Sequence, residues 1–578
     1  MTSLLTLNDL RVTFPGHEAV RGLNLTLNAG ETLALVGESG CGKSATALSL
    51  MRLLPDSTRL QGEILFDGQN LLTLPDAQMR QRRGNQLSMI FQEPMTSLNP
   101  VLSIGQQIAE TLHVHQQLTP AAARKRAIEL LDLVRIPEPA RRVDDYPHNL
   151  SGGQRQRVMI AMAVACQPRL LIADEPTTAL DVTIQAQILA LLDRLRLELS
   201  MGLLLITHDL GLMSQWADRV AVMYAGQKVE EAPTAQLFSA PQHPYTRGLL
   251  GTSLHMDQDM HYRDSRLPEI HHQQDAQGSA FTLVTPPPLV HTPRQTDQQP
   301  LLSLRDVHTE YQTVQGKVSA VNGVSLDIHP GETLGLIGES GCGKSTLSKT
   351  ILPFCPPRRA ALFLTVRRSP TTKSHALRHC VIASLRQRVQ MIFQDPYASL
   401  NPRHSIQHIL ETPLVVHGIG SRAERQRAVR EILDKVGLPQ RSLERYPHEF
   451  SGGQRIGIAR ALVIKPSLVI CDEPVSALDV SIQAQILNLL VELKNDMGLA
   501  LLFISHDLAV VRYIADNVMV MHNGNCVEQG DSYRIWHQPQ HPYTRKLIDA
   551  VPGATPRNTQ DMPARAIPTV HLTERQTA

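Results

Sequence analysis

The stretch that decides the fold is GESGCGKS at residues 37–44, and it occurs again, letter for letter, at residues 338–345. Apolar, strand-like residues precede each copy, LNLTLNAGETLALVG at 23–37 and VSLDIHPGETLGLIG at 324–338. A strand, a glycine-rich turn and a helical pattern, in this order, form the context that a phosphate-binding loop requires. One match in a long chain carries a risk of chance, but two matches in the same context do not. The sequence therefore predicts two phosphate-binding loops.

Four further motifs, FQ(E/D)P, SGGQR, DEP and HD, follow each loop in the same order. The corresponding pairs are Lys43 and Lys344, Gln92 and Gln394, Ser151 and Ser451, Asp174 and Asp472, and His208 and His506. Their spacings run 301, 302, 300, 298 and 298 residues. Two copies of one nucleotide-handling unit are therefore fused in tandem, and the drift in spacing locates their differences.

The bulk composition favours an intracellular protein that does not bind nucleic acid. The net charge is +2 and aromatic residues make up 4% of the 578 residues, so no basic surface with stacking aromatics is expected. The seven cysteines lack a CxxC pair and an even framework, which fits a reduced compartment. The start MTSLLTLNDL does not resemble a secretion signal, and no apolar run is long enough to span a membrane. We expect a chain that is neither exported nor membrane-spanning by itself.

Composition also divides the chain. The expected parts are a first domain at 1–251, a His/Gln/Pro-rich linker at 252–300, a second domain at 301–552 and a polar tail at 553–578. Within each domain a helix-rich stretch, such as TPAAARKRAIELLDLV at 119–134, predicts a helical subdomain. The linker is expected to be poorly ordered. Its histidines, His255, His261, His271 and His272, lack regular ligand spacing, which favours a solvated tether over a metal site.

The glycine-rich loops have the chemistry to hold phosphates. Glycines let backbone N–H groups point inward, and the helix after each loop presents its positive end. Lys43 and Lys344 are expected to neutralise the β and γ phosphates, and Ser44 and Ser345 to supply a hydroxyl to Mg²⁺. The candidate loop residues are Gly37, Glu38, Ser39, Gly40, Cys41, Gly42, Lys43, Ser44, Gly338, Glu339, Ser340, Gly341, Cys342, Gly343, Lys344, Ser345 and Thr346.

Paired carboxylates follow two further apolar runs. Asp174 and Asp472 end these runs and are candidate Mg²⁺ ligands, while the adjacent Glu175 and Glu473 are placed to polarise an attacking water. The alternative, an acidic strand end bound to structural lysines, is disfavoured because a phosphate loop lies upstream in each copy.

The glutamines and histidines of the recurring motifs are further candidates. Gln92 and Gln394 have the donor and acceptor groups to bind a water or Mg²⁺, and His208 and His506 are placed to contact a terminal phosphate. Taken singly, each of these residue types is more often an ordinary polar residue. Their order and recurrence favour a catalytic role.

The SGGQR motifs combine a hydroxyl, two small residues and a predicted helix start, which is a second anion-binding element. Its candidate residues are Ser151, Gly152, Gly153, Gln154, Ser451, Gly452, Gly453 and Gln454. With them the ordered set resembles the ATP-binding cassette (ABC) ATPases: Walker A, Q-loop, signature, Walker B, D-loop (TALD at 178–181, SALD at 476–479) and switch histidine. The resemblance covers nearly the whole chain outside the linker and the tail, twice.

The resemblance implies an α/β fold with two tandem P-loop NTPase (ABC-type) domains. Each would have a RecA-like core, an antiparallel β subdomain and a helical subdomain. It also implies that ATP and Mg²⁺ are held between the Walker A of one cassette and the signature of the other. Site one would join Lys43, Gln92, Asp174, Glu175 and His208 to Ser451, Gly452, Gly453 and Gln454. Site two would join Lys344, Gln394, Asp472, Glu473 and His506 to Ser151, Gly152, Gly153 and Gln154. Phe14 and Tyr311 stand where the family stacks an aromatic on adenine, although Phe14 also fits a core position.

Further sequence motifs narrow the resemblance to one group of importers. QEPMTSLNP at 92–100, QDPYASLNP at 394–402, and PQHPYTR at 241–247 and 539–545 are similar to dipeptide, oligopeptide and nickel importers. This implies a peripheral ATPase on the cytoplasmic face of the inner membrane, driving peptide import with two permease subunits and an extracytoplasmic solute-binding protein. The alternatives are a soluble ABC protein acting on ribosomes or DNA, which the linker, the near-neutral charge and the HPYT elements disfavour, and a decayed paralogue that transports nothing. No cysteine lies between Cys166 and Cys342, so no iron–sulfur cluster is expected there.

The second copy departs from the first at residues 353–384, which contain no Gly, Asp or Glu. The first copy has QGEILFDGQ at 61–69, a strand ending in an Asp-Gly turn. Codons compatible with LFLTV at 362–366, read one base out of phase, spell Ile-Phe-Asp-Gly. We therefore hypothesise a compensated frameshift over this segment, with ordinary divergence as the alternative.

The second departure lies in the signature helix. SGGQRQRVMIA at 151–161 corresponds to SGGQRIGIA at 451–459, which lacks one Gln-Arg pair. Removing two residues from a helix rotates the remainder of the helix by about 200° and shortens it by about 3 Å. Either the signature helix is displaced or a loop absorbs the change. Because this signature would serve site one, we expect site one to close poorly, and ATPase activity to rise when Gln-Arg is restored after Arg455.

Overall fold

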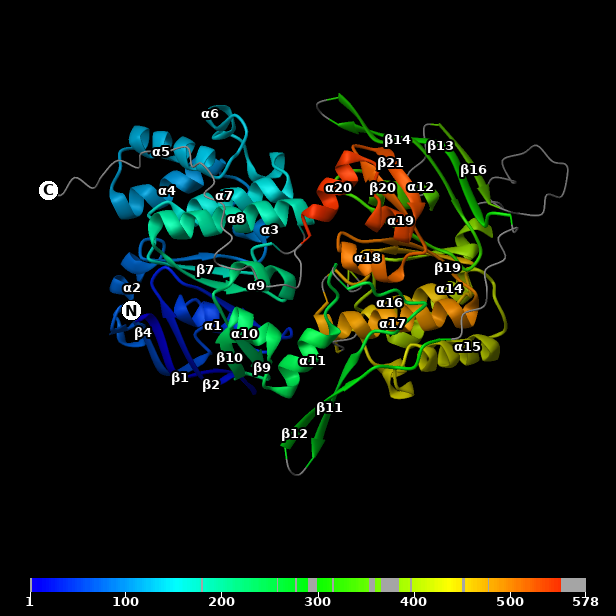
Figure 1. The fold of residues 1–578 in the computed structure, drawn as a ribbon, viewed down its shortest axis with the longest axis horizontal. Helices are drawn as coiled ribbons and strands as arrows, with labels where there is room; N and C mark the ends of the chain where they lie inside the picture. The colour runs from blue at the N-terminus through cyan, green and yellow to red at the C-terminus, as the bar shows by residue number, and fades with distance from the viewer. Residues whose placement is uncertain are drawn as a thin grey trace.

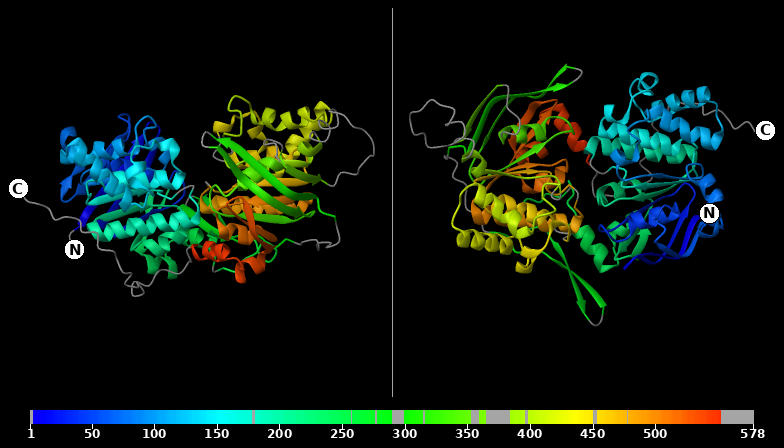
Figure 2. Two further views of the ribbon diagram at one scale, coloured as in Figure 1. Left: turned by 90° about the horizontal axis from the view of Figure 1, so that it is seen from above. Right: turned by 180° about the vertical axis from the view of Figure 1, so that it is seen from behind.

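The computed structural model describes residues 3–177, 180–256, 258–275, 278–289, 299–313, 316–352, 359–364, 384–395, 398–449, 453–476 and 478–551. These residues form two lobes that lie side by side, one from each half of the chain (Figure 1). The view from above shows the same separation (Figure 2). The two halves therefore fold as distinct units around separate cores.

Two sheets build the first lobe. A mostly parallel six-stranded sheet has the order β10-β9-β3-β8-β7-β6, and an antiparallel four-stranded sheet has the order β2-β1-β4-β5. The strands are β1 (Ser3–Phe14), β2 (His17–Asn28), β3 (Thr32–Val36), β4 (Arg59–Phe66), β5 (Gln69–Asn70), β6 (Leu87–Ile90), β7 (Leu170–Asp174), β8 (Gly202–Ile206), β9 (Arg219–Tyr224) and β10 (Gln227–Pro233). Strands β3, β7 and β8 are buried along their whole length, as expected for parallel strands covered on both faces.

The second lobe repeats this plan. Its six-stranded sheet has the order β17-β18-β19-β15-β20-β21, and its antiparallel sheet the order β14-β13-β16. The strands are β13 (Leu302–Thr313), β14 (Gly316–Ile328), β15 (Thr333–Ile337), β16 (Arg359–Leu364), β17 (Val389–Ile392), β18 (Leu468–Asp472), β19 (Ala500–Ile504), β20 (Asn517–His522) and β21 (Asn525–Asp531). The predicted α/β class with an antiparallel β subdomain in each half is confirmed.

Each lobe also has a helical subdomain, as predicted. In the first lobe it contains α4 (Ile104–Gln116), α5 (Pro120–Leu133) and α7 (Gly152–Val164), and in the second α14 (Ile406–Val416), α15 (Arg422–Lys435) and α16 (Gly453–Leu462). Thr119 starts α5 by accepting a hydrogen bond from the backbone of Ala122. In Figure 1 α4 and α5 lie at the top of one lobe, whereas α14 and α15 lie low in the other. The two lobes therefore point in opposite directions.

The remaining helices cover the sheets and the lobe boundary. They are α1 (Lys43–Leu50), α2 (Asp76–Arg82), α3 (Pro94–Ser97), α6 (Pro139–Arg142), α8 (Val182–Leu199), α9 (Leu210–Trp216), α10 (Thr234–Ser239), α11 (Pro244–Thr252), α12 (Lys344–Ile351), α17 (Val480–Met497), α18 (Leu508–Ile514), α19 (Ser532–His537) and α20 (Pro542–Asp549).

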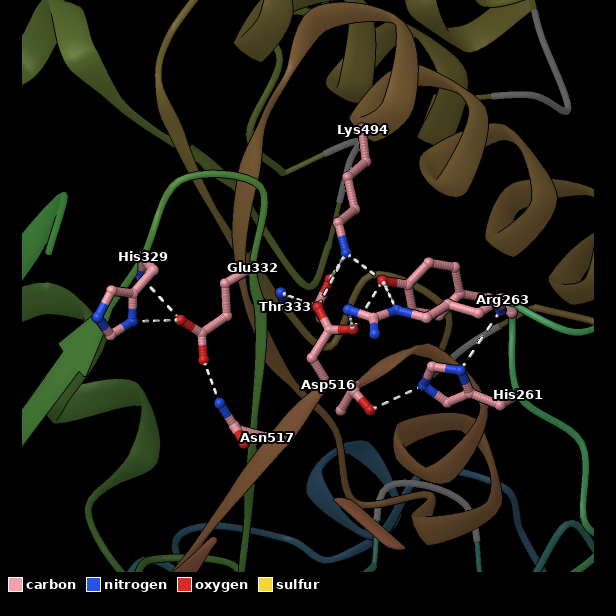
Figure 3. A network of polar contacts seen from close by, with 10 residues as sticks. His261, Arg263, His329, Glu332, Thr333, Lys494, Asp516 and Asn517 are labelled. Carbon is pink, nitrogen blue, oxygen red and sulfur yellow. Dashed lines mark hydrogen bonds and ion pairs between the residues drawn. The ribbon is translucent and has the colours of Figure 1, made fainter. Parts of the chain in front are cut away.

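The segment between the domains is built against the second lobe. Tyr262 is only 4% exposed, and its hydroxyl donates to Asp516 Oδ1 at 2.7 Å and accepts from Lys494 Nζ at 2.7 Å (Figure 3). His261 Nε2 lies 3.1 Å from the carbonyl oxygen of Ala515, and His255 is buried. The expectation of a poorly ordered, solvated tether is therefore wrong for this part of the linker.

Farther along, the linker forms a hairpin. Leu267 exchanges two backbone hydrogen bonds with the side chain of Asn488 in α17, at 3.1 and 2.8 Å. Strands β11 (Glu269–Asp275) and β12 (Gly278–Val284) then pair with each other as an antiparallel hairpin, which projects from the body of the molecule in Figure 2. Composition did not reveal this order, because polar residues such as these are common in unstructured tethers.

The proposed frameshift falls mostly outside the described residues, which include only 359–364 and 384 of the interval. The backbone of β16 pairs with β13 so that Leu364 lies opposite Leu302. In the first lobe Phe66 lies opposite Leu5 in the same way. The strand position is therefore filled in both lobes, and the frameshift stays a hypothesis.

Candidate functional site

Each phosphate-binding loop lies between a buried strand and a helix. In the first lobe it joins β3 to α1, and Lys43 Nζ donates to the carbonyl oxygens of Gly37 and Glu38 at 2.7 and 2.9 Å. Lys344 makes the same two contacts in the second lobe, at 2.7 and 3.0 Å. Gly42 has a φ of 102°, and a Cβ there would lie 2.5 Å from the oxygen of Ala19. Glycine is therefore required where the loop turns into the helix.

The serine after each lysine reaches the carboxylate at the end of the neighbouring strand. Ser44 Oγ donates to Asp174 Oδ1 at 3.2 Å, and Ser345 Oγ donates to Asp472 Oδ1 at the same distance. Burial, with a further contribution from the charge of the adjacent glutamate, raises the pKa of both aspartates. A buried carboxylate beside a hydroxyl is a ligand set that suits a hard cation such as Mg²⁺.

The glutamate after each of these aspartates is turned by an unusual backbone conformation. Glu175 has a φ of 47°, and its N–H donates to the oxygen of Ile206 at 2.9 Å. Its carboxylate accepts a hydrogen bond from Gln92 Nε2 at 2.8 Å and lies 3.4 Å from His208 Nδ1. A left-handed backbone is strained for a residue with a Cβ. This conformation directs the carboxylate into the space between the glutamine and the histidine.

The second lobe repeats this trio. Glu473 has a φ of 50°, accepts from Gln394 Nε2 at 2.7 Å and lies 3.4 Å from His506 Nδ1. Burial opposes ionisation of both groups, but their mutual hydrogen bond and charge outweigh it. The pKa of Glu473 is therefore lowered and the pKa of His506 is raised. Both trios thus bring together three residues predicted from the sequence.

Residues of one lobe also contact the phosphate loop of the other. The N–H of Ser39 donates to Asp479 Oδ1 at 2.7 Å, and Ser481 Oγ donates to Glu38 Oε1. The reciprocal contacts join the N–H of Ser340 to Asp181 Oδ2 at 3.4 Å and Thr183 Oγ1 to Glu339 Oε1 at 2.9 Å. The D-loops are recognisable in the sequence, but no role was predicted for Asp181, Thr183, Asp479 or Ser481. Their recurrence at a constant offset of 298 residues was a signal that could have found them.

A tyrosine of each HPYT element supports the phosphate loop of its own lobe. The hydroxyl of Tyr245 accepts from the N–H of Glu38 at 3.3 Å, and that of Tyr543 accepts from the N–H of Glu339 at 3.0 Å. Tyr245 is fully buried, and burial raises the pKa of its hydroxyl. From the sequence, the HPYT motif indicated only the importer type, and this supporting role of its tyrosine was not predicted.

The remaining candidates differ between the lobes. Ser151 begins α7 with a capping box, accepting from the N–H of Gln154 while Gln154 Oε1 accepts from the N–H of Ser151. Ser451 and Gly452 lie outside the described residues. Phe14 packs partly against the first core, whereas Tyr311 is 39% exposed and donates to Thr346 Oγ1 at 3.4 Å. Stacking of these two rings on adenine stays a prediction.

This doubled arrangement of Walker, glutamine, signature and histidine residues defines an ABC-type ATPase, and comparison with known proteins agrees. Residues 20–178 and 321–476 match the ABC transporter family, and residues 229–281 and 527–574 match the oligopeptide/dipeptide transporter C-terminal region. The chain belongs to the ABC transporter family.

Two relatives point the same way. The chain is 48% identical to the glutathione import ATP-binding protein GsiA of Pectobacterium atrosepticum, over 94% of this chain and 88% of that protein. It is 47% identical to GsiA of Salmonella typhimurium, over 96% and 90%. The solved structure of a dimeric bacterial ABC transporter cassette, MJ0796, is 28% identical, covers 40% of this chain and 98% of that chain, and has a TM-score of 0.36.

The chain is accordingly the ATP-binding and ATP-hydrolysing subunit of a peptide importer of the dipeptide/oligopeptide type, and it works with membrane permeases. These relatives do not support the alternatives of a soluble ribosome or DNA factor or of a decayed paralogue. No helix in the described parts of the chain is both long and apolar enough to cross a membrane.

Proposed function

We propose that the chain hydrolyses ATP with Mg²⁺ at two composite sites between its lobes, and so energises the import of short peptides of the glutathione type. The observation that carries this proposal is the reciprocal contact of each D-loop aspartate with the phosphate loop of the other lobe. It brings the lobes together head to tail, as the composite sites require. The import of glutathione by the relatives is the basis for the substrate class.

Within each site the chain's own residues have separable tasks. Lys344 and the N–H groups of its loop bind the phosphates, with the lysine held in place by two loop carbonyl oxygens. Ser345 and Asp472 would hold Mg²⁺, which when bound neutralises charge on the phosphates. Glu473 is held by Gln394 and His506, where it orients the attacking water and accepts its proton.

The proposed surroundings follow from the importer type. Two permease subunits and an extracytoplasmic solute-binding protein complete the transporter, and the chain sits peripherally on the cytoplasmic face of the inner membrane. ATP binding closes the lobes, and hydrolysis reopens them. This alternation drives the permeases through their inward-facing and outward-facing states.

The test measures ATP hydrolysis and solute uptake for the same variants. The full chain is expressed with its permeases and binding protein, and ATP hydrolysis and glutathione uptake are measured for Glu473→Gln and for the control Glu444→Gln, whose side chain is exposed. Losing the proton acceptor is expected to lower hydrolysis by about 100-fold or more and to abolish uptake, while the control behaves as wild type. Full activity in Glu473→Gln contradicts the proposed site. Uptake of ordinary dipeptides without glutathione contradicts the proposed substrate class.

A further inference from the structure

We propose that the two ATP sites are unequal: site two, served by the first signature, turns ATP over, whereas site one hydrolyses ATP slowly. This inference rests on the proposed composite sites. The observation behind it is the position that the second signature helix takes in its lobe. The missing Gln-Arg pair has to be absorbed somewhere, and the described residues of α16 show where.

A buried arginine fixes the register of each signature helix. In the first lobe Arg157 donates to the carbonyl oxygen of Val134 at 2.7 Å and to Gln187 Oε1 at 2.7 Å. In the second lobe Arg455 donates to the carbonyl oxygen of Val436 at 2.7 Å and to Gln485 Oε1 at 3.2 Å. Arg455 therefore takes the place of Arg157, although the motif letters align it with Arg155.

The neighbouring residues follow the same register. Gln454 is 5% exposed and takes the place of Gln156, which is 2% exposed. Ile456 and Val158, one position after the arginines, are both fully buried. From this point on, α16 packs as α7 does. The helix has not rotated, so the two missing residues must be lost before Arg455.

The chain upstream is anchored as well. Pro447–Glu449 forms a short 3-10 helix, as Pro147–Asn149 does in the first lobe. Glu449 Oε2 accepts a hydrogen bond from the N–H of Tyr446 at 2.7 Å. Between this turn and the anchoring arginine the second lobe has two residues fewer than the first. The shortening by two residues therefore lies between Glu449 and Arg455.

The first residues of the signature carry its chemistry. In the first lobe α7 begins five residues before Arg157. Ser151 is its N-cap and forms a capping box with Gln154. In the second lobe the glutamine of the motif is buried and donates to the oxygen of Pro474, so it does not occupy the position that Gln154 has. Two residues of helix correspond to about 3 Å, as much as the whole length of a hydrogen bond. The second lobe therefore has, ahead of Arg455, two residues fewer with which to build a signature, and we expect this signature to contribute less to site one than the first does to site two.

The first experiment compares the two glutamates in the full-length protein. We expect Glu473→Gln, in site two, to lower ATP turnover at least tenfold more than Glu175→Gln, in site one, because only site two has a complete signature. Equal losses in the two variants would overturn the inference. No loss in either would instead count against the proposed catalytic sites.

The second experiment repairs the motif. Inserting Gln-Arg between Gly453 and Gln454 should raise turnover about twofold and bring the effects of the two glutamate variants together, since both sites then have a complete signature. The matched change, deletion of Gln154 and Arg155, should remove most of the activity. Thermal unfolding of both variants checks that they fold. A repaired, folded protein that still shows unequal glutamates would overturn the inference.

Discussion

The buried hydroxyl of Tyr262 joins the linker to the second lobe, and removing this one oxygen atom is expected to weaken the attachment of the linker strongly. Tyr262→Phe removes the hydroxyl that donates to Asp516 and accepts from Lys494 and, at 3.3 Å, from Arg263 Nε. It keeps the ring, over which Lys494 Nζ lies 4.4 Å from the centroid. Packing and the cation–π contact are therefore retained, and the variant reports on the hydrogen bonds alone.

The expected magnitude follows from the charges. The side chains of Lys494 and Asp516 are 7% and 3% exposed, and a hydrogen bond to a charged group contributes about 1.5–3 kcal/mol. Both groups keep other partners, because Lys494 also donates to Thr333 Oγ1 and Asp516 also pairs with Arg263. We therefore expect a loss of about 2 kcal/mol for the hydrogen bonds of this hydroxyl together, below the sum of their full contributions.

Limited proteolysis measures this loss. If the linker opens locally, trypsin cleavage after Arg263 tracks the open population, and about 2 kcal/mol corresponds to roughly a 30-fold faster cleavage. The control is Tyr533→Phe, at a tyrosine that is 62% exposed, which should be cleaved as wild type. Cleavage of Tyr262→Phe at the wild-type rate would refute the argument that this hydroxyl fastens the linker.

Three further outcomes are expected. His506→Gln should be least stable relative to wild type between about pH 4.5 and 6.5. The stabilising contribution of the histidine is lost as pH rises through its raised pKa, and that of Glu473 is lost as pH falls through its lowered pKa. Thermal unfolding across this pH range checks the prediction, and a stability difference that does not change with pH contradicts it. Asp479→Ala should tighten ATP binding by up to about tenfold, measured by calorimetry, because a charged acceptor no longer competes for the N–H of Ser39; weaker binding argues against this. Gln154→Ala should slow ATP turnover severalfold while lowering stability by only about 0.5–1 kcal/mol, because half of a capping box is lost, and unchanged turnover contradicts this.

The core and most of the candidate site could be predicted from sequence because the motifs recur. A glycine-rich loop after an apolar strand, and a carboxylate pair after another, fix local geometry by steric and electrostatic rules that need no distant partner. The trio of Gln92, Glu175 and His208 was predicted in the same way, since order and repetition identified its members. The motifs do not encode the left-handed backbone at Glu175, which depends on its hydrogen bond to β8.

The partners of Tyr262, Asp181 and Asp479, which lie far away in the sequence, could not be predicted. The linker is polar and proline-rich, and its single tyrosine, Tyr262, gives no local sign that Asp516 lies 254 residues away to receive it. The trans contacts of Asp181 and Asp479 depend likewise on the opposed orientation of the lobes. In each case a polar residue is stabilised by a partner remote in sequence, and composition alone assigns such a residue to solvent.

The signature helix shows how packing overrides matching letters. SGGQR at 451–455 aligns Arg455 with Arg155 by letter, but burial lowers the pKa of both Arg157 and Arg455, so each buried guanidinium requires its carbonyl and amide acceptors. Leaving a buried charge without acceptors is costly, and the helix therefore adopts the register in which Arg455 reaches Val436 and Gln485. The two missing residues are then missing from the segment ahead of Arg455. Because the missing pair duplicates the Gln-Arg beside it, inserting Gln-Arg on either side of the existing pair gives the same protein, and the repair tests the signature whichever alignment is used.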